Sequence, residues 1–268
     1  MSKILTHFAW RYSLLKRWFF YWRYCINYNE IIQYERTRQP FKSIQLKPQG
    51  QIHFEDVSEA LLIFQDVFHA QVYTRKYRGK PRVVVDIGAN IGTFSLYAAY
   101  KWPHSEIYAF EPAPRNFSLL QRNVHTMPQT NFHLYNAAAT AQAGKINLHL
   151  KSSNGWHSVY RAQTDIVLDT VEVEAVDLEA ILAECGGKVD FLKLDCEGGE
   201  WALFENKMGL VQKSVQYLAM EYHEVEGYTG YQMENWLKKA GFLVTLTKPD
   251  QYGTGKLWAR KPYAHYSG

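Results

Sequence analysis

The chain has little cysteine, no long uncharged apolar run and no large surplus of charge, and each absence excludes a class of protein. Only three of its 268 residues are cysteines, and their positions lack the paired spacing of a disulfide framework or a zinc site. No uncharged run approaches the ~20 residues that a helix needs to cross a bilayer, and no small-residue cleavage site follows the N-terminal segment. The net charge of +4 is too small to predict nucleic-acid binding. We therefore expect a cytoplasmic globular protein that does not bind nucleic acid.

Basic and aromatic residues crowd the first 29 residues, and the first acidic residue is Glu30. Apolar side chains spaced by three or four residues form one stripe of a helix, while the basic residues lie off it. The stripe consists of Ile4, Phe8, Tyr12, Leu15, Phe19, Trp22 and Ile26. We expect this amphipathic helix to pack on the domain or on a second subunit in a homodimer. The alternative is peripheral contact with a membrane, with the basic residues toward anionic lipid.

The composition changes near residue 80, where a basic linker ends at Pro81. Residues 1–80 form a helical, aromatic and basic N-terminal extension in this interpretation, and residues 81–268 form the main domain. In the main domain β-branched runs alternate with helical patterns, which predicts an α/β, doubly wound, mostly parallel sheet. Alternating segments around residues 145–176 indicate a β insertion, and the polar stretch 152–158 between them is a candidate lid.

The stretch from Asp86 to Gly92 follows three valines and has the pattern of a strand end, a tight turn and a helix start. Gly88 and Gly92 let the backbone turn sharply and approach a ligand, and the opening helix turn offers unpaired N–H groups. The turn lacks the G-x-G-x-x-G pattern of a dinucleotide site, and Asp86 places negative charge where a pyrophosphate would lie. A cationic or zwitterionic ligand fits better, such as the methionine part of S-adenosylmethionine (SAM). The structural alternative is that Asp86 caps the helix.

A second acidic residue ends the next predicted strand. Glu111 lies 23 residues after Gly88, and Pro112 stops the strand behind it. An acid at this place, about 20 residues beyond the glycine turn, can accept hydrogen bonds from both hydroxyls of a ribose. Because the carboxyl ends of parallel strands meet at one edge of the sheet, several strand-end residues should line that edge. They are Asp86, Glu111, Asn136, Asp195 and Glu221.

Three further motifs complete the pattern: Asn136-Ala-Ala, Leu192-Lys-Leu-Asp195-Cys-Glu197-Gly-Gly-Glu200 and Glu221-Tyr-His223. Together with the two acidic turns they resemble the FkbM family of SAM-dependent methyltransferases, over about residues 83–250. Gly199 departs from the family pattern, which usually has alanine there. The resemblance implies a class I, Rossmann-like methyltransferase with a seven-stranded sheet. It also implies transfer of a methyl group to a hydroxyl of a glycan, a lipid or a secondary metabolite.

The resemblance also assigns cofactor-binding residues. Asp86, Gly88, Asn90 and Gly92 would surround the methionine moiety, and Glu111 would hold the ribose. Asn136 is expected near the adenine, with a structural role in its turn as the alternative.

Catalysis by such an enzyme needs alignment more than a protein nucleophile, because the sulfonium donor is already activated. A hydroxyl acceptor is a poor nucleophile while it is protonated, so a base helps. By position the candidates are Asp195, Glu197 and His223. We expect Asp195 to contact SAM or the acceptor and His223 to act as the base; the structural alternative is a hydrogen-bonded histidine. No metal is assigned, although these residues with Glu221 would also suit a divalent cation such as Mg or Mn.

Two other classes of function remain open at the level of the sequence. A nicotinamide-dependent oxidoreductase shares the strand-turn-helix pattern, but Asp86 and the absence of G-x-G-x-x-G argue against it. A non-catalytic SAM-binding or membrane-associated interaction protein would account for the aromatic, basic N-terminus. The sequence does not identify the acceptor, since fold alone does not specify a substrate.

Overall fold

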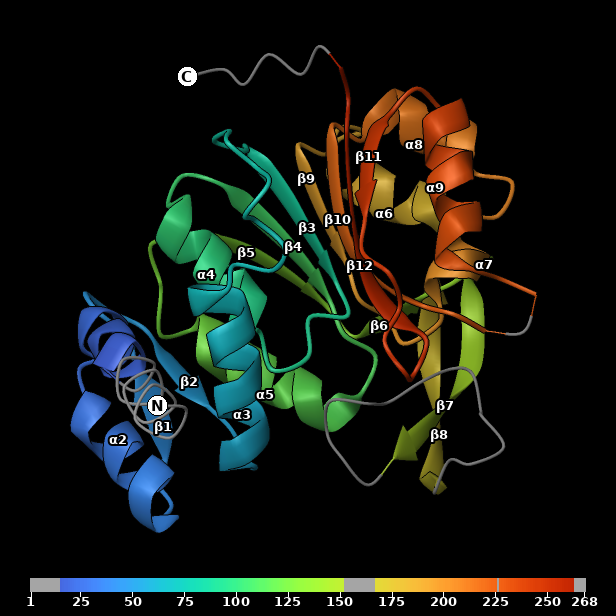
Figure 1. Ribbon diagram of the computed structural model, residues 1–268. Helices are drawn as coiled ribbons and strands as arrows, with labels where there is room; N and C mark the ends of the chain where they lie inside the picture. Colours follow the sequence, from blue (N-terminus) through green and yellow to red (C-terminus); the bar gives the residue numbers. More distant parts are fainter. Residues whose placement is uncertain (1–14, 152–166, 226, 263–268) are drawn as a thin grey trace.

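The computed structural model describes residues 15–151, 167–225 and 227–262. Its centre is a seven-stranded sheet of order β11-β12-β10-β9-β3-β4-β5 (Figure 1). In this order the strands are Leu243–Leu246, Thr254–Arg260, Tyr217–His223, Phe191–Leu194, Val83–Ile87, Glu106–Phe110 and Asn131–Tyr135. Strand β12 is antiparallel to both β10 and β11, and the pairs from β10 to β5 are parallel. The predicted doubly wound, mostly parallel α/β fold is therefore confirmed, and the sheet ends in the antiparallel hairpin of β11 and β12.

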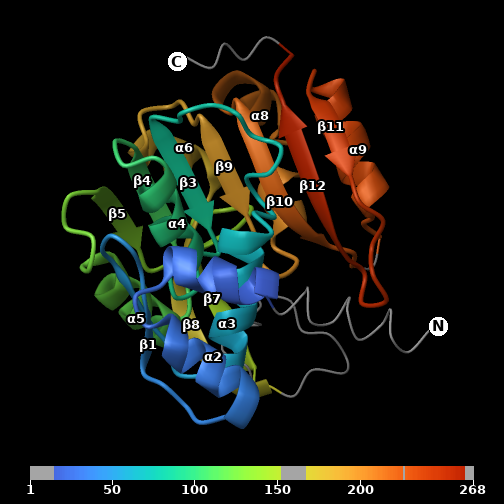
Figure 2. The ribbon, with the colours of Figure 1, turned by 60° about the vertical axis from the view of Figure 1, so that its left-hand side comes forward.

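Helices cover both faces of this sheet (Figures 1 and 2). One face carries α3 (Val57–Phe64), α4 (Thr93–Lys101) and α5 (Pro114–Val124). The other carries α6 (Leu178–Glu184), α7 (Glu200–Phe204), α8 (Met208–Ser214) and α9 (Gly230–Lys239). Strand β3 is covered on both sides, which favours β-branched residues; four of its five residues are valine or isoleucine, and four of the five are buried.

The segment before the sheet packs against the first of these faces. It contains α2 (Tyr28–Thr37), the antiparallel pair β1 (Ser43–Gln45) and β2 (Gln51–His53), and a π-helical turn η1 (Gln65–His69) that continues α3. Aromatic rings join it to the sheet domain. The ring of Phe68 lies 4.6 Å from that of Phe64 and 5.0 Å from that of Tyr97 on α4, measured between centroids. The segment before residue 80 thus shares a hydrophobic cluster with the main sheet.

The first helix, described over residues 15–24, buries a different face from the predicted one. Phe20 and Tyr21 are buried, whereas the described members of the predicted stripe are half exposed or more. Tyr21 can be buried because its hydroxyl donates to Glu35 at 2.9 Å and accepts from Gln65 at 2.6 Å. The helix therefore packs on the domain, as one of the expectations had it, but through this other face and not through the described members of the stripe. Residues 4, 8 and 12 lie outside the described residues. Every helix in the described part of the chain is too short or too polar to cross a membrane.

A second, three-stranded sheet lies at the carboxyl-terminal edge of the main sheet (Figure 1). Its order is β6-β8-β7, with β6 (Ala137–Ala139), β7 (Gly144–Lys151) and β8 (Val167–Val176). Strands β7 and β8 pair antiparallel, with a register irregularity between Leu150 and Lys151. The candidate lid at 152–158 lies outside the described residues.

Candidate active site

The turn after β3 is held against two neighbouring strands. The backbone N–H groups of Gly88 and Ala89 both donate to the carbonyl of Phe110, at 3.0 Å. Gly88 has φ +73°, and a Cβ built on it would lie 1.7 Å from the carbonyl oxygen of Asp195. Glycine is therefore required at this position by the close approach of two chain turns as well as by its backbone conformation. Gly92 is similar, with φ +87° and a built Cβ only 2.6 Å from Cδ1 of Leu120.

Asp86 lies inside the protein, under this turn. It is fully buried, accepts a hydrogen bond from Ser95 Oγ at 2.6 Å and forms an ion pair with Lys193 Nζ at 3.0 Å. The same Nζ donates to the carbonyl of Gly88 at 2.6 Å. The side chain of Asp86 thus supports the turn from within and lines neither cavity described below. Its contact with the methionine moiety stays a prediction.

Lys193 was not among the residues singled out from the sequence. Burial opposes its charge, but the carboxylates of Asp86 and Asp195 outweigh this effect and raise the pKa of Lys193. The signal was present, since Lys193 is the one charged residue of the buried strand Phe191–Leu194. A buried lysine normally requires a paired carboxylate.

Glu111 is positioned by two backbone groups at the end of β4. The N–H of Asn90 donates to its Oε2 at 2.8 Å, and the N–H of Ala113 donates to its Oε1 at 2.9 Å. Burial raises the pKa of Glu111 to about 7, although these two bonds act in the opposite direction. Each oxygen has a second lone pair for a further donor, so the carboxylate can still accept bonds from a ligand.

Asn136 ties the ends of two strands together. Its Nδ2 donates to the carbonyl of Glu111 at 2.8 Å and to that of Pro112 at 3.0 Å. These contacts are those of the structural alternative considered from the sequence. The predicted contact of Asn136 with adenine stays a prediction.

Two cavities meet at the carboxyl ends of the parallel strands. The first is lined by Glu111 and by apolar residues that include Phe110 and Leu148. The second extends between α3, η1, Tyr73 and the turn between β11 and β12. Four residues line both cavities: Gly88, Asn90, Asp195 and Glu197.

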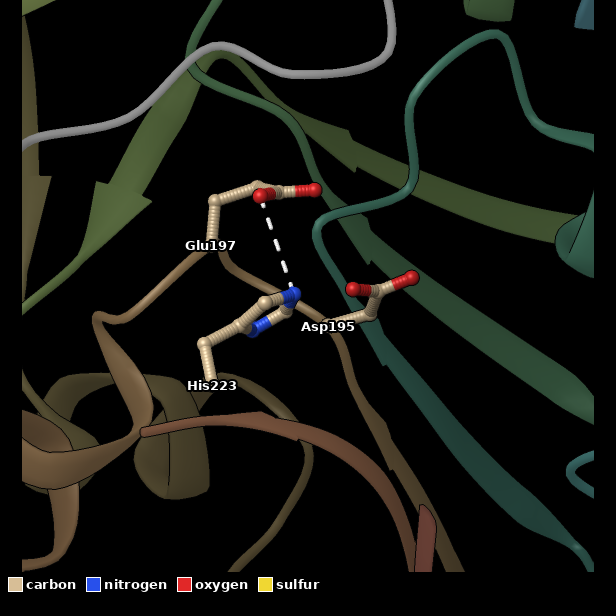
Figure 3. A group of neighbouring side chains, drawn as sticks. All are labelled: Asp195, Glu197 and His223. Atoms are coloured by element: carbon tan, nitrogen blue, oxygen red, sulfur yellow. Dashed lines mark ion pairs between the residues drawn. The ribbon is translucent and has the colours of Figure 1, made fainter. Parts of the chain in front are cut away.

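The three predicted catalytic residues come together at this junction. Asp195 and Glu197 follow β9, and His223 ends the neighbouring β10 (Figure 3). His223 Nε2 lies 3.6 Å from Glu197 Oε2, and one ligand atom from each of the three side chains lies within 4.8 Å of the others. Glu197 has φ +52°, an uncommon backbone conformation for a residue with a side chain.

Glu200 holds the other side of the imidazole. It is fully buried on the first turn of α7, and its Oε1 lies 3.0 Å from His223 Nδ1. Burial opposes the charge of His223, but Glu200, Glu197 and Asp195 raise its pKa to about 10. Burial raises the pKa of Glu197 to about 8, against the effect of His223. From the sequence alone, an acidic residue on the first turn of a helix indicates only a favourable interaction with the helix dipole.

Asp195 has an unexpected partner from the segment before the sheet. The buried hydroxyl of Tyr73 donates to Asp195 Oδ2 at 2.8 Å. Burial disfavours the ionised carboxylate, but Lys193, His223 and Lys256 lower the pKa of Asp195. Nothing in the sequence pointed to Tyr73, which lies 122 positions away. Glu221 also reaches the site, as predicted for the strand ends, and forms an ion pair with Lys256 of β12.

Comparison with known proteins identifies the family of the chain. The profile of the family described as Methyltransferase FkbM domain matches residues 86–244. Methyltransferase sdnD of Sordaria araneosa is 28% identical, over 72% of this chain and 88% of its own length. The 31-O-demethyl-FK506 methyltransferase FkbM of Streptomyces tacrolimicus is 26% identical, over 70% and 84%. The Hexuronic acid methyltransferase AglP of Haloferax volcanii is 28% identical, over 62% and 65%. Since the matched domain covers more than half of the chain, the protein belongs to the FkbM methyltransferase family, whose members transfer the methyl group of SAM.

Proposed function

We propose that the protein is an O-methyltransferase that holds SAM in the first cavity and a hydroxyl-bearing acceptor in the second. The observation that carries this proposal is the position of Asp195, Glu197 and His223 at the junction of the two cavities. The names of two relatives support it, since one methylates an oxygen and the other a hexuronic acid. The acceptor class follows the sequence interpretation: a glycan, a lipid or a secondary metabolite.

The first cavity has the polar groups that a nucleoside needs. Glu111 would accept hydrogen bonds from the ribose hydroxyls, while its backbone donors keep the carboxylate in place. Asp195 has a lowered pKa and lines both cavities, so it would face the ammonium group of the methionine moiety. Bound SAM supplies an activated methyl group, and the protein has to align the acceptor oxygen with it.

His223 is the base in this proposal. Glu200 holds Nδ1, so Nε2 is the nitrogen on the side of Glu197, within the second cavity. A carboxylate in this place orients the imidazole and stabilises the imidazolium that forms when it takes a proton. Without ligands the surrounding carboxylates favour the protonated form of His223. The positive charge of a bound sulfonium acts in the opposite direction and favours the neutral form, which accepts the proton of the acceptor hydroxyl.

A divalent cation is the second candidate for activating the acceptor. Asp195, Glu197 and His223 place one ligand atom each within 4.8 Å of one another. A metal-bound histidine usually donates its other ring N–H to a carboxylate. Glu200 is placed for this role, because its Oε1 lies 3.0 Å from Nδ1 of His223. Such a cation would lower the pKa of the acceptor hydroxyl and reduce the need for a base. Activity that survives a chelator excludes this candidate.

The test is transfer of tritium from methyl-labelled SAM to the host's glycans, lipids and small metabolites. We expect label in an alkali-stable methyl ether, and we expect His223→Asn to lower the rate of labelling about 10²-fold or more while retaining S-adenosylhomocysteine binding. A protein that binds S-adenosylhomocysteine but labels no fraction would instead be a non-catalytic SAM-binding protein. Label on nitrogen, or full activity of His223→Asn, would contradict the proposal.

A further inference from the structure

The first helix and the turn that follows it carry four large apolar side chains that face solvent. The exposed fractions of Leu15, Phe19, Trp22 and Ile26 are 60%, 59%, 50% and 53%. The spacing of Leu15, Phe19 and Trp22 places them on one side of the helix, Ile26 follows in the turn, and we call the four residues the apolar stripe. Together they expose on the order of 500 Å², which is the size of patch that marks an interaction surface on a monomer.

The helix cannot turn this stripe toward the core. On its opposite side the ring of Phe20 lies 5.4 Å from that of Phe64 on α3, measured between centroids. Tyr21 is fully buried and donates to Glu35. Rotation of the helix would expose both aromatic rings and break this hydrogen bond. The outward position of the apolar stripe is therefore fixed by the packing of the other face.

Positive charge borders the apolar stripe. Lys16 and Arg23 are exposed and each follows a stripe residue directly. The ammonium group of Lys47 lies 5.2 Å from the centre of the Trp22 ring. No acidic residue occurs between positions 15 and 29. Aromatic rings at the headgroup level with basic residues beside them are typical of helices that lie in a membrane interface.

We propose that the apolar stripe docks the protein on a bilayer that contains anionic lipid, with the first helix lying along the surface. Basic side chains beside the stripe then contact lipid phosphates. A second copy of the chain fits less well, because the stripe is smaller than the roughly 800 Å² that each partner of a stable dimer buries. A two-fold contact would also bring the flanking cations of the two copies together.

Helix α3 lies beside the first helix (Figure 2), and it also lines the second cavity. Its Phe64 contacts Phe20 of the first helix, while Leu62 and Ile63 line the cavity. Docking would therefore hold the cavity close to the membrane, which suits an acceptor carried by a lipid. This consequence rests on the proposed function, whereas docking itself does not.

The experiment is sedimentation of the full chain with vesicles of phosphatidylcholine, with and without phosphatidylglycerol. We expect binding to the anionic vesicles, weaker binding to the neutral ones, and release by high salt. The double variant Phe19→Ser/Trp22→Ser should lose at least about tenfold in vesicle affinity, because two aromatic side chains no longer leave water. Arg23→Glu should reduce the preference for anionic vesicles and leave binding to neutral vesicles unchanged.

Tyr231→Ser is the matched control, because Tyr231 is a 54% exposed aromatic residue on α9, outside the stripe. It should bind vesicles as the unmodified chain does. Calorimetric binding of S-adenosylhomocysteine verifies that each variant is folded, and this readout does not depend on the acceptor. Equal vesicle binding by the double variant would overturn the proposal. So would a dimer in lipid-free solution that dissociates in the double variant, since the stripe would then bind a second copy.

Discussion

Replacement of Lys193 by methionine tests whether the buried pair with Asp86 supports the cofactor turn. Nζ lies 3.0 Å from Asp86 Oδ1 and donates to the carbonyl of Gly88 at 2.6 Å, and both paired side chains are almost fully buried. Lys193→Met leaves the carboxylate uncompensated in the core. Breaking a buried ion pair in this way typically costs about 3–5 kcal/mol. We expect a loss of stability in this range and weaker binding of S-adenosylhomocysteine.

Lys238→Met is the matched control for this change. Lys238 forms an ion pair of similar length, 2.8 Å to Glu234, but its side chain is 52% exposed. Such exposed helix pairs contribute about 0.3–0.5 kcal/mol. Urea unfolding followed by tryptophan fluorescence measures both variants, and Asp86→Asn/Lys193→Met should be more stable than Lys193→Met alone because position 86 then carries no buried charge. The reasoning is refuted if Lys193→Met and Lys238→Met unfold within about 1 kcal/mol of each other.

Three further predictions concern the turn, the ribose carboxylate and the base. Gly88→Ala should abolish S-adenosylhomocysteine binding in calorimetry, because the added Cβ would overlap the carbonyl of Asp195. Gly209→Ala on α8 is the control: its added Cβ meets no atom within 4 Å, so this variant should bind normally. Burial raises the pKa of Glu111 from 4.5 to about 7, so the folded state retains a proton that the unfolded state loses. The contribution of Glu111 to the free energy of unfolding should fall as pH rises from 4.5 through 7, by up to about 3 kcal/mol. In urea unfolding, Glu111→Gln should lack this part of the pH dependence. The same pH profile in the variant and the unmodified chain would contradict the raised pKa of Glu111. His223→Asn should lower kcat about 10²-fold or more with unchanged S-adenosylhomocysteine affinity. His125→Asn, at an exposed helix end, should leave kcat unchanged. Equal kcat values for His223→Asn and the unmodified chain would exclude His223 as the base.

The main features of the fold could be predicted from the sequence because they depend on local patterns. The valines of β3 indicate a strand covered on both faces, and Gly88 marks the turn where two chain segments approach closely. Strand ends that share an edge bring Asp195 and His223 together, although 28 positions separate them in the chain. These inferences need only the period of a strand and the parallel order of the sheet.

Contacts between distant segments could not be predicted in this way. The hydroxyl of Tyr73 reaches Asp195 because the segment before the sheet folds back over the site, and no local pattern records that path. The buried face of the first helix was misjudged for a related reason. Its stripe is the more regular one, but Tyr21 finds hydrogen-bond partners inside the fold, which periodicity does not reveal. The role of Lys193 could have been found, since a lysine within a buried strand needs a carboxylate partner.

The central claim is that the carboxyl ends of β3 and β4 bind the nucleoside of the methyl donor through Glu111. Isothermal titration of S-adenosylhomocysteine into the folded full chain tests it most directly. We predict one site per chain, with affinity reduced at least about tenfold in Glu111→Ala, because a carboxylate that accepts bonds from ribose hydroxyls is then missing. No heat of binding with the folded protein, or equal affinity of Glu111→Ala, would contradict the account.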